Sequence, residues 1–437
     1  MYLERKIDAE LENWKQLPKR KPLVLRGARQ VGKSSAVRNL AIQFKYFIEI
    51  NFDESPSYTA IFENDLDPIA ICEQLSVITN TPIVAGETLL FFDEIQSCIP
   101  AISALRYFYE KMPQLHLIAA GSLLEFALSE IPSFGVGRVR SIFMYPLSFE
   151  EFLLANKENS LLEAATKATT QKALSEIFHQ KLKSYLKKFL IIGGMPEAVK
   201  SYILNGDMLE TQRILDDLIL SIQADFTKYK TRVSTARIRE VFNAVVQQVG
   251  CKFSYSYPNA TLNNVQIKEA LTLLEMAGLV YFVTHSASNG IPIGAEINPK
   301  KRKILLFDTG IFQRILGLNI APLLIEDDFN IINKGNIAEL FVGLELIKNT
   351  SCYEKTALYY WQRESKNSQA EVDYVIQKQD QIIPLEVKAG TKGAMQSMYL
   401  FLEEKKSDFG IRLSLENFSE MEKIKIHPLY AIKNVLV

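Results

Sequence analysis

The eight residues GARQVGKS, from Gly27 to Ser34, constrain the fold of this chain more than any other segment. They match the pattern G-x-x-x-x-G-K-[ST] and lie between an apolar run, PLVLR, and an amphipathic run, SSAVRNLAIQF. A glycine-rich turn between a strand and a helix lets consecutive backbone N–H groups face an anion, and the helix N-terminus adds a favourable dipole. The segment therefore predicts a strand, a phosphate-binding loop and a helix in this order.

The side chains of this loop suit a nucleoside triphosphate. Lys33 should neutralise the charge of the β- and γ-phosphates, and Ser34 should supply a hydroxyl ligand to Mg²⁺. We therefore expect ATP and Mg²⁺ as cofactors. The residues expected to contact the nucleotide are Gly27, Ala28, Arg29, Gln30, Val31, Gly32, Lys33, Ser34, Ser35 and Ser122.

A second apolar run, LLFFDE at Leu89–Glu94, ends in two acids about 60 residues after the loop. Many strands end in an acid, so this run alone is not specific. It indicates a nucleotide site because a phosphate-binding loop precedes it. We expect Asp93 to help hold Mg²⁺ and Glu94 to polarise the attacking water. This pair is typical of nucleotide hydrolysis rather than of phosphate transfer to a second substrate.

Two more polar residues are candidates for the same site. Ser122 follows the apolar run LHLIAAG and is expected to sense the γ-phosphate, a role compatible with capping a helix. Arg138, in the loop FGVGRVR, is expected to act as an arginine finger on the nucleotide of a neighbouring subunit, with Arg140 as its competitor. A finger supplied by a neighbour predicts a homo-oligomer.

The apolar pattern changes along the chain and divides it into four parts. Short apolar runs alternating with amphipathic segments predict a parallel sheet covered by helices at 1–148. Helical periodicity, broken by the turn-like IGGMPEAV at Ile192–Val199, predicts an α-helical lid at 149–230. Two amphipathic helices followed by an apolar extended run predict a winged-helix-like module at 231–288, with a plain helical linker as the alternative. A mixed α/β pattern fills 289–437.

The segment EVDYVIQKQDQIIPLEVKAG, from Glu371 to Gly390, predicts a hairpin with charged residues on both strands. Asp373 lies on the first strand, while Glu386 and Lys388, two residues apart, share one face of the second. Two carboxylates can hold Mg²⁺ beside a scissile phosphate while a lysine orients the attacking water. The hairpin therefore has the residues of a metal-dependent nuclease.

Glu339, in the upstream helical segment NKGNIAELFVG, is the expected third carboxylate of that metal site. Two alternatives remain open for the domain. One is a domain of the same fold that grips nucleic acid without cutting it, and the other is a domain that docks a protein partner.

The motifs GARQVGKS, LLFFDEIQ, AAGS, GRV with YPLSFEEF, and GGMPEAV, in this order, resemble a family of bacterial and archaeal AAA+ ATPases. The family is related to the STAND class and carries a C-terminal domain of unknown function with a restriction-endonuclease-like, PD-(D/E)xK fold. The resemblance implies an ATP-hydrolysing core, a winged helix and a nuclease-like tail. The catalytic residues would be Lys33, Asp93, Glu94, Arg138, Asp373, Glu386 and Lys388, and the metal ligands Ser34, Asp93, Glu339, Asp373 and Glu386.

Composition limits the partners. Lys plus Arg and Asp plus Glu number 50 each, so nucleic-acid binding would depend on local patches such as Lys19–Lys21 and Lys300–Lys303, which are otherwise solvated surface. Four scattered cysteines without a CxxC pattern predict reduced thiols and a cytoplasmic location. The N-terminal segment lacks the apolar core of a signal peptide, and no run of about 18 apolar residues occurs, so we expect no membrane partner.

We therefore expect an oligomeric ATP-hydrolysing protein that acts on DNA, branched or single-stranded DNA included, through the winged helix and the nuclease-like domain. The alternative is a nucleotide-gated signalling or scaffold ATPase whose C-terminal domain binds a protein partner and does not cut.

Overall fold

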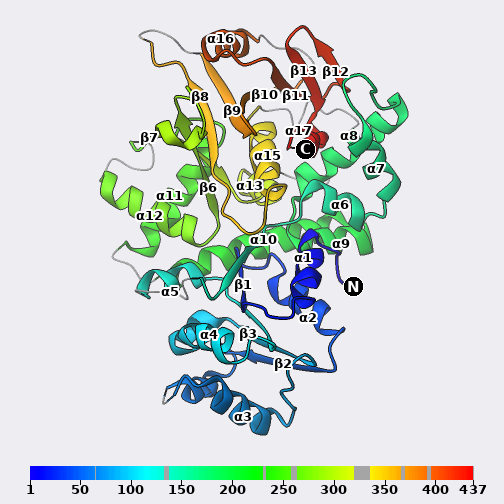
Figure 1. Ribbon diagram of the computed structural model, residues 1–437. Coiled ribbons are helices and arrows are strands. Elements are labelled where there is room, and N and C mark those ends of the chain that lie inside the picture. Colours follow the sequence, from blue (N-terminus) through cyan, green and yellow to red (C-terminus); the bar gives the residue numbers. More distant parts are fainter. Residues whose placement is uncertain are drawn as a thin grey trace. The chain divides into compact units, whose positions relative to one another are not determined.

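The computed structural model describes residues 1–63, 65–131, 137–229, 233–256, 263–318, 335–365, 370–390 and 395–436 (Figure 1). The chain forms two compact units. The first comprises Met1–Pro146 together with two short later segments, Met276–Gly278 and Ser351–Lys355, and the second comprises Leu147–Glu275, Leu279–Thr350 and Thr356–Val437. Within the described part of the chain, no helix combines the length and apolar character needed to cross a bilayer.

The first unit is built on a five-stranded parallel sheet, as predicted, with the order β2-β3-β4-β1-β5. Its strands are β1 (Leu23–Arg26), β2 (Tyr46–Asn51), β3 (Thr88–Asp93), β4 (His116–Ala120) and β5 (Arg140–Phe143). The carboxyl ends of parallel strands meet at one edge of a sheet, where ligands bind in open α/β folds. The loops after β1, β3 and β4 therefore reach the same edge.

Helices cover this sheet and close its core. They are α1 (Lys6–Lys15), α2 (Lys33–Ala41), α3 (Pro68–Thr79), α4 (Ile99–Lys111) and α5 (Leu124–Glu130), with 3-10 turns η1 (Pro56–Phe62) and η2 (Ile95–Ser97). Every residue of β3 is buried, which accounts for its continuous apolar run. The ring of Phe92 contacts those of Phe52, Phe62 and Phe108 edge to face. This packing fixes the strand that carries Asp93.

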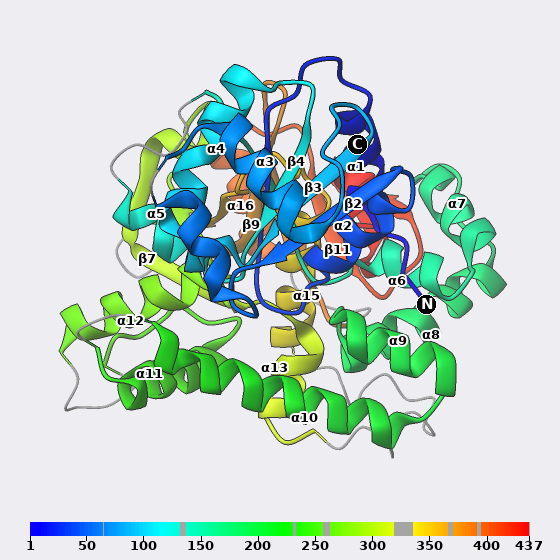
Figure 2. The ribbon, with the colours of Figure 1, turned by 90° about the horizontal axis from the view of Figure 1, so that it is seen from below.

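The second unit begins with helices: α6 (Phe149–Ala155), α7 (Asn159–Lys167), α8 (Glu176–Ile192), α9 (Pro196–Asn205), α10 (Met208–Asp225), α11 (Thr235–Gln248) and α12 (Asn264–Met276), with a turn η3 (Phe226–Lys228). Ser148 and Glu151 form a capping box at the start of α6. Gly193, at a φ of 78°, ends α8, and Pro196 begins α9. The long helix α10 packs on α9 (Figure 2).

An eight-stranded mixed sheet completes the second unit, in the order β12-β13-β11-β10-β9-β8-β6-β7. Its strands are β6 (Val280–Ser286), β7 (Ile297–Leu306), β8 (Leu358–Gln362), β9 (Glu371–Lys378), β10 (Gln381–Val387), β11 (Gly410–Ser414), β12 (Ser419–Met421) and β13 (Ile424–Pro428). The accompanying helices are α13 (Thr309–Ile315), α15 (Gly335–Lys348), α16 (Gln396–Lys405) and α17 (Lys433–Leu436), with turns η4 (Ile293–Glu296) and η6 (Leu429–Ala431). The predicted hairpin is present as β9 and β10, which pair antiparallel.

The helices α11 and α12 precede β6, which is the predicted order of two helices and an extended run, and β6 pairs antiparallel with β7 outside the predicted module. However, β6 also pairs in parallel with β8, so the pair forms one end of the large sheet. A domain boundary at 288/289 therefore passes between two paired strands. The pairing of β6 with β8 joins residues far apart in the chain, and local periodicity carries no signal for it.

Candidate active site

The loop between β1 and α2 adopts a backbone that depends on glycine. Gly27, Gln30 and Gly32 have φ values of 142°, 60° and 98°. A Cβ added to Gly27 would overlap the carbonyl oxygen of Met144. Gly32 is the N-cap of α2, so the helix begins directly at Lys33. The sequence motif thus produces the expected strand, tight loop and helix start.

Lys33 folds back over this loop. Its Nζ donates hydrogen bonds to the carbonyl oxygens of Gly27, at 2.9 Å, and Ala28, at 2.8 Å. Burial lowers the pKa of Lys33 to about 8, although the nearby Glu94 and Asp93 carboxylates act in the opposite direction. A charged phosphate is a stronger partner for an ammonium than a neutral carbonyl, so Lys33 is placed to exchange these bonds for phosphate contacts.

Ser34, in the first turn of α2, contacts Asp93, the last residue of β3. The Ser34 Oγ donates to the Asp93 Oδ2 at 2.7 Å, and Asp93 is buried. Burial raises the pKa of Asp93, and the hydrogen bond from Ser34 partly offsets this effect. A hydroxyl beside a carboxylate provides hard oxygen ligands of the kind that Mg²⁺ takes with nucleotide phosphates. The donor set therefore fits Mg²⁺, and these two residues would hold it.

Glu94 follows Asp93 in a left-handed conformation, with a φ of 47°. Its Oε2 accepts hydrogen bonds from the Oγ of Ser122, at 3.1 Å, and from Gln96 Nε2. Burial acts to raise the pKa of Glu94, but these hydrogen bonds and the charge of Lys33 outweigh burial and lower the pKa. Ser122, which is expected to sense the γ-phosphate, contacts the carboxylate that is expected to polarise water. The site therefore brings the ends of β3 and β4 together.

Two supporting residues of this site escaped the sequence motifs. Arg5, buried ahead of α1, donates from Nη1 to the Val31 carbonyl at 2.9 Å and from Nη2 to the Tyr145 carbonyl at 2.7 Å. It therefore fixes the phosphate loop from outside. Gln96 binds Glu94 as described, and its spacing in DEIQ is the sequence signal that could have suggested it. Arg5 offers no local signal, since its partners are distant in sequence.

Arg138, the predicted finger, lies just after the undescribed residues 132–136. Within its own chain it pairs with Glu110 of α4, and half of its side chain is exposed. Arg140, the competitor, lies over the ring of Tyr353 with 5.6 Å between its guanidinium carbon and the ring centre. The contact with a neighbouring subunit stays a prediction.

The tail hairpin brings three of its predicted residues together. The Oδ2 of Asp373, on β9, accepts a hydrogen bond from the backbone N–H of Val387 at 2.8 Å. The Nζ of Lys388 donates to the Oε1 of Glu386 at 2.7 Å. Asp373 thus lies beside the E-x-K triplet, as the hairpin pattern predicts.

A lysine that the motif did not include lies among these acids. The Nζ of Lys303, on β7, is 2.8 Å from Glu339 Oε1, 2.7 Å from Glu371 Oε1 and 3.7 Å from Asp373 Oδ1. Its side chain is only 1% exposed. Burial alone would lower the pKa of Lys303, but the three carboxylates outweigh burial and raise it. Lys303 therefore remains a cation inside the domain.

This arrangement differs from the predicted magnesium site. Across the described ranges, no group of three or more His, Cys, Asp or Glu side chains is arranged to hold a metal ion. Glu339 is joined to Lys303, and Glu386 to Lys388. The structure therefore does not bring Glu339, Asp373 and Glu386 into one metal-ligating group, because ammonium groups already pair with two of them.

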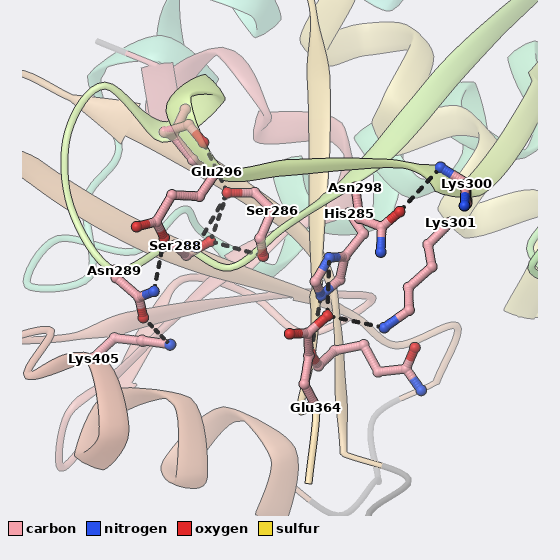
Figure 3. A network of polar contacts seen from close by, with 12 residues as sticks. His285, Ser286, Ser288, Asn289, Glu296, Asn298, Lys300, Lys301, Glu364 and Lys405 are labelled. Carbon is pink, nitrogen blue, oxygen red and sulfur yellow. Dashed lines mark hydrogen bonds and ion pairs between the residues drawn. The ribbon is translucent and has the colours of Figure 1, made fainter.

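Each of the two basic runs contains one buried residue, although Lys19 and Lys300 are exposed. Arg20 is buried, and its guanidinium donates to the carbonyls of Leu17 and Gln114. Lys301 forms an ion pair with Glu364 at 3.0 Å, which Figure 3 shows beside His285. With Lys303 buried as well, these runs add no support to DNA binding. The four cysteines are free thiols.

Three segments of the chain match known family models. Residues 19–153 match a model described as an AAA domain. Residues 183–321 match a domain of unknown function, DUF8612, and residues 334–432 match another, DUF4143. No curated protein matches the chain.

Solved structures with low similarity include two that contain DNA. The Aeropyrum pernix ORC1 protein in complex with DNA is 13% identical, with 74% of this chain and 93% of that chain covered and a TM-score of 0.25. Drosophila ORC bound to DNA is 16% identical, with 71% and 85% covered and a TM-score of 0.23. C. elegans PCH-2 is 12% identical, with 63% and 67% covered and a TM-score of 0.24. Scores of this size carry no argument about function.

The identification therefore rests on the AAA match, supported by the strand order and the geometry of the phosphate loop. These observations show that residues 19–153 are similar to an AAA domain and contain a phosphate-binding loop between a strand and a helix.

Proposed function

We propose that the chain binds and hydrolyses ATP at the edge of the sheet where β1, β3 and β4 end. The observation that carries this proposal is the 2.7 Å hydrogen bond between Ser34 and Asp93, which joins the start of α2 to the end of β3. This hydrogen bond joins the two residues that we propose as magnesium ligands, and Lys33 and Glu94 are their immediate neighbours in the chain.

The residues divide the chemistry among them. The backbone N–H groups of the loop and the ammonium of Lys33 hold the β- and γ-phosphates. Ser34 and Asp93 would hold Mg²⁺, which when bound neutralises charge on the phosphate oxygens. Glu94 is ionised and accepts a hydrogen bond from the attacking water, and Ser122 fixes the orientation of that carboxylate.

Steady-state ATP hydrolysis by the purified chain tests this proposal. Wild-type protein should release phosphate in the presence of Mg²⁺, and Lys33→Ala should lower the rate by roughly 100-fold or more because phosphate charge loses its cation. Lys45→Ala is the matched control, since Lys45 is an exposed lysine of the same unit that pairs with Glu87. Equal rates in wild type and Lys33→Ala would show that the phosphate release does not come from this site.

The finer proposal is that hydrolysis serves an action on DNA by an oligomer. Its test is to repeat the ATPase assay with single-stranded, duplex and branched DNA. Stimulation by one of these structures supports the DNA-acting machine. A rate that is the same with every DNA favours the alternative, a nucleotide-gated signalling or scaffold ATPase with a protein partner.

One observation favours that alternative for the tail. The buried ammonium of Lys303 contacts Glu339 and Glu371 and lies near Asp373, where the nuclease hypothesis requires a metal ion. A tail domain of this kind can still bind a partner. If the chain acts on DNA, this domain would then take part without cleaving it.

A further inference from the structure

We infer that Lys303 takes the place of a divalent cation in the acidic cluster of the tail, so that an internal ammonium holds the carboxylates of α15 and β9 together and the β9–β10 hairpin does not act as a metal-dependent nuclease. This inference concerns the tail alone and does not depend on ATP hydrolysis.

The geometry of Lys303 is that of a bound cation. Carboxylates from two different elements, Glu339 of α15 and Glu371 of β9, contact its Nζ at 2.8 and 2.7 Å, and Asp373 lies 3.7 Å away. The lysine itself comes from a third element, β7, and is almost fully enclosed. A divalent ion at this position would have to displace a buried like charge from its partners.

The charges of the cluster are nearly balanced without a metal ion. Besides Lys303, Lys252 pairs with Glu371 at 2.9 Å, and Lys388 pairs with Glu386 at 2.7 Å. The three ammonium groups face four carboxylates, those of Glu339, Glu371, Asp373 and Glu386. The cluster thus carries a single excess negative charge when every group is ionised.

Glu386 is paired through one carboxylate oxygen, Oε1, with the ammonium of Lys388. Its Oε2 is buried and has no hydrogen-bond partner among the residues that the structure describes. Burial first, and then the nearby Asp373 charge, raise the pKa of Glu386 to about 7. The ammonium of Lys388 is therefore the cation that pairs with Glu386, without a metal ion.

Further hydrogen bonds hold the acidic residues in this arrangement. The Val387 N–H binds Asp373 Oδ2, and the Tyr374 hydroxyl donates to the backbone carbonyl of Glu339 at 2.8 Å. Turning these groups toward a metal ion would break contacts that the fold already makes.

Manganese binding, measured by electron paramagnetic resonance without nucleotide, tests the inference. All proteins should carry Ser34→Ala, which removes the hydroxyl ligand of the phosphate loop. We expect no Mn²⁺ site that depends on Asp373 in this background. Adding Lys303→Met should create one bound ion, because it leaves the carboxylates without their internal cation, and Asp373→Asn should abolish that ion.

Lys301→Met is the matched control, since Lys301 is a neighbouring lysine whose partner, Glu364, lies outside the cluster. It should gain no Mn²⁺. In thermal unfolding, Lys303→Met should melt several degrees lower than the control and recover on addition of Mg²⁺, whereas Lys301→Met should not respond to the ion.

Three results would overturn the inference. They are an Asp373-dependent Mn²⁺ site in protein that retains Lys303, Mg²⁺-dependent DNA cleavage that Asp373→Asn abolishes, and a folded Lys303→Met variant that binds no ion. If Lys303→Met does not fold, protein that retains Lys303 decides the question through the first two measurements, and the absence of both signals supports the inference.

Discussion

Lys33 is the residue whose charge links folding to nucleotide binding. Its pKa falls to about 8 in the folded protein, below the ordinary lysine value of 10.5. The unfolded chain therefore binds more protons than the folded chain between these values, and stability should rise as pH increases through this window. Binding of a phosphate stabilises the charged form of Lys33 and therefore raises its pKa again.

This linkage predicts that Mg²⁺-ATP binding is accompanied by proton uptake near pH 8. Uptake should be larger at pH 8.5 than at pH 7, where Lys33 is already charged. Calorimetric titrations in two buffers with different ionisation enthalpies measure the number of protons exchanged. The same number at both pH values would contradict the role of Lys33.

Ser122 should act on catalysis through Glu94 rather than through ATP binding. Its hydroxyl contacts the Glu94 carboxylate at 3.1 Å, so Ser122→Ala should slow hydrolysis by roughly 10-fold or more while the Kd for ATP stays nearly unchanged. Ser129→Ala, at an exposed serine of α5 whose hydroxyl binds only its own helix, is the control. A large loss of ATP affinity in Ser122→Ala would instead indicate a direct phosphate contact.

At the scale of elements, one buried carboxylate joins two helices of the second unit. Asp308 Oδ1 caps α13 by accepting from Ile311 N–H at 3.0 Å, and Oδ2 accepts from Gly194 N–H at 2.7 Å. Gly194 lies in the turn after α8, within the GGMPEAV motif. The motif therefore forms a turn that is fixed by an acid more than 100 residues later.

Asp308→Ala should lower the free energy of unfolding by roughly 2–4 kcal/mol, because it removes a cap and leaves a buried N–H unsatisfied. Urea unfolding followed by circular dichroism measures the loss. Asp207→Ala removes an exposed cap of α10, which accepts from Leu209 and Glu210, and should cost about 1 kcal/mol. Equal losses in the two variants would argue against the buried link.

The elements that depend on local sequence patterns could be predicted from the sequence. The phosphate loop, the parallel sheet and the β9–β10 hairpin follow from glycine positions, apolar runs and strand alternation. The position of Lys303 could not, because the KKRK run looks like solvated surface, and its partner Glu339 lies 36 residues away on another element. The pairing of β6 with β8 escaped prediction for the same reason.

In the nucleotide site too, the residues with a local sequence signal could be predicted and those without one could not. The sequence motifs predicted Lys33, Ser34, Asp93 and Glu94 as site residues. In the structure Ser34 contacts Asp93, and Lys33 and Glu94 are their neighbours in the chain. Arg5 could not be predicted, because the two carbonyls that it binds lie 26 and 140 residues away in the sequence.

At the scale of the whole molecule, the central question is whether hydrolysis needs a second copy of the chain. If Arg138 reaches a neighbour's nucleotide, Arg138→Ala should abolish the rise in specific activity with protein concentration. Glu110→Gln breaks the intrachain pair but keeps the arginine, so it should retain this rise. ATPase rates measured over a protein dilution series provide the test, and unchanged turnover in Arg138→Ala would support hydrolysis by a single subunit.

The most informative measurement separates ATP binding from ATP hydrolysis in Glu94→Gln. The substitution keeps the size of the side chain and removes the carboxylate beside Asp93, so Kd for ATP should stay within a few-fold of wild type while hydrolysis falls by roughly 10²–10⁴-fold. That result would establish the end of β3 as the catalytic edge of an ATPase. Hydrolysis at the wild-type rate in Glu94→Gln would contradict it.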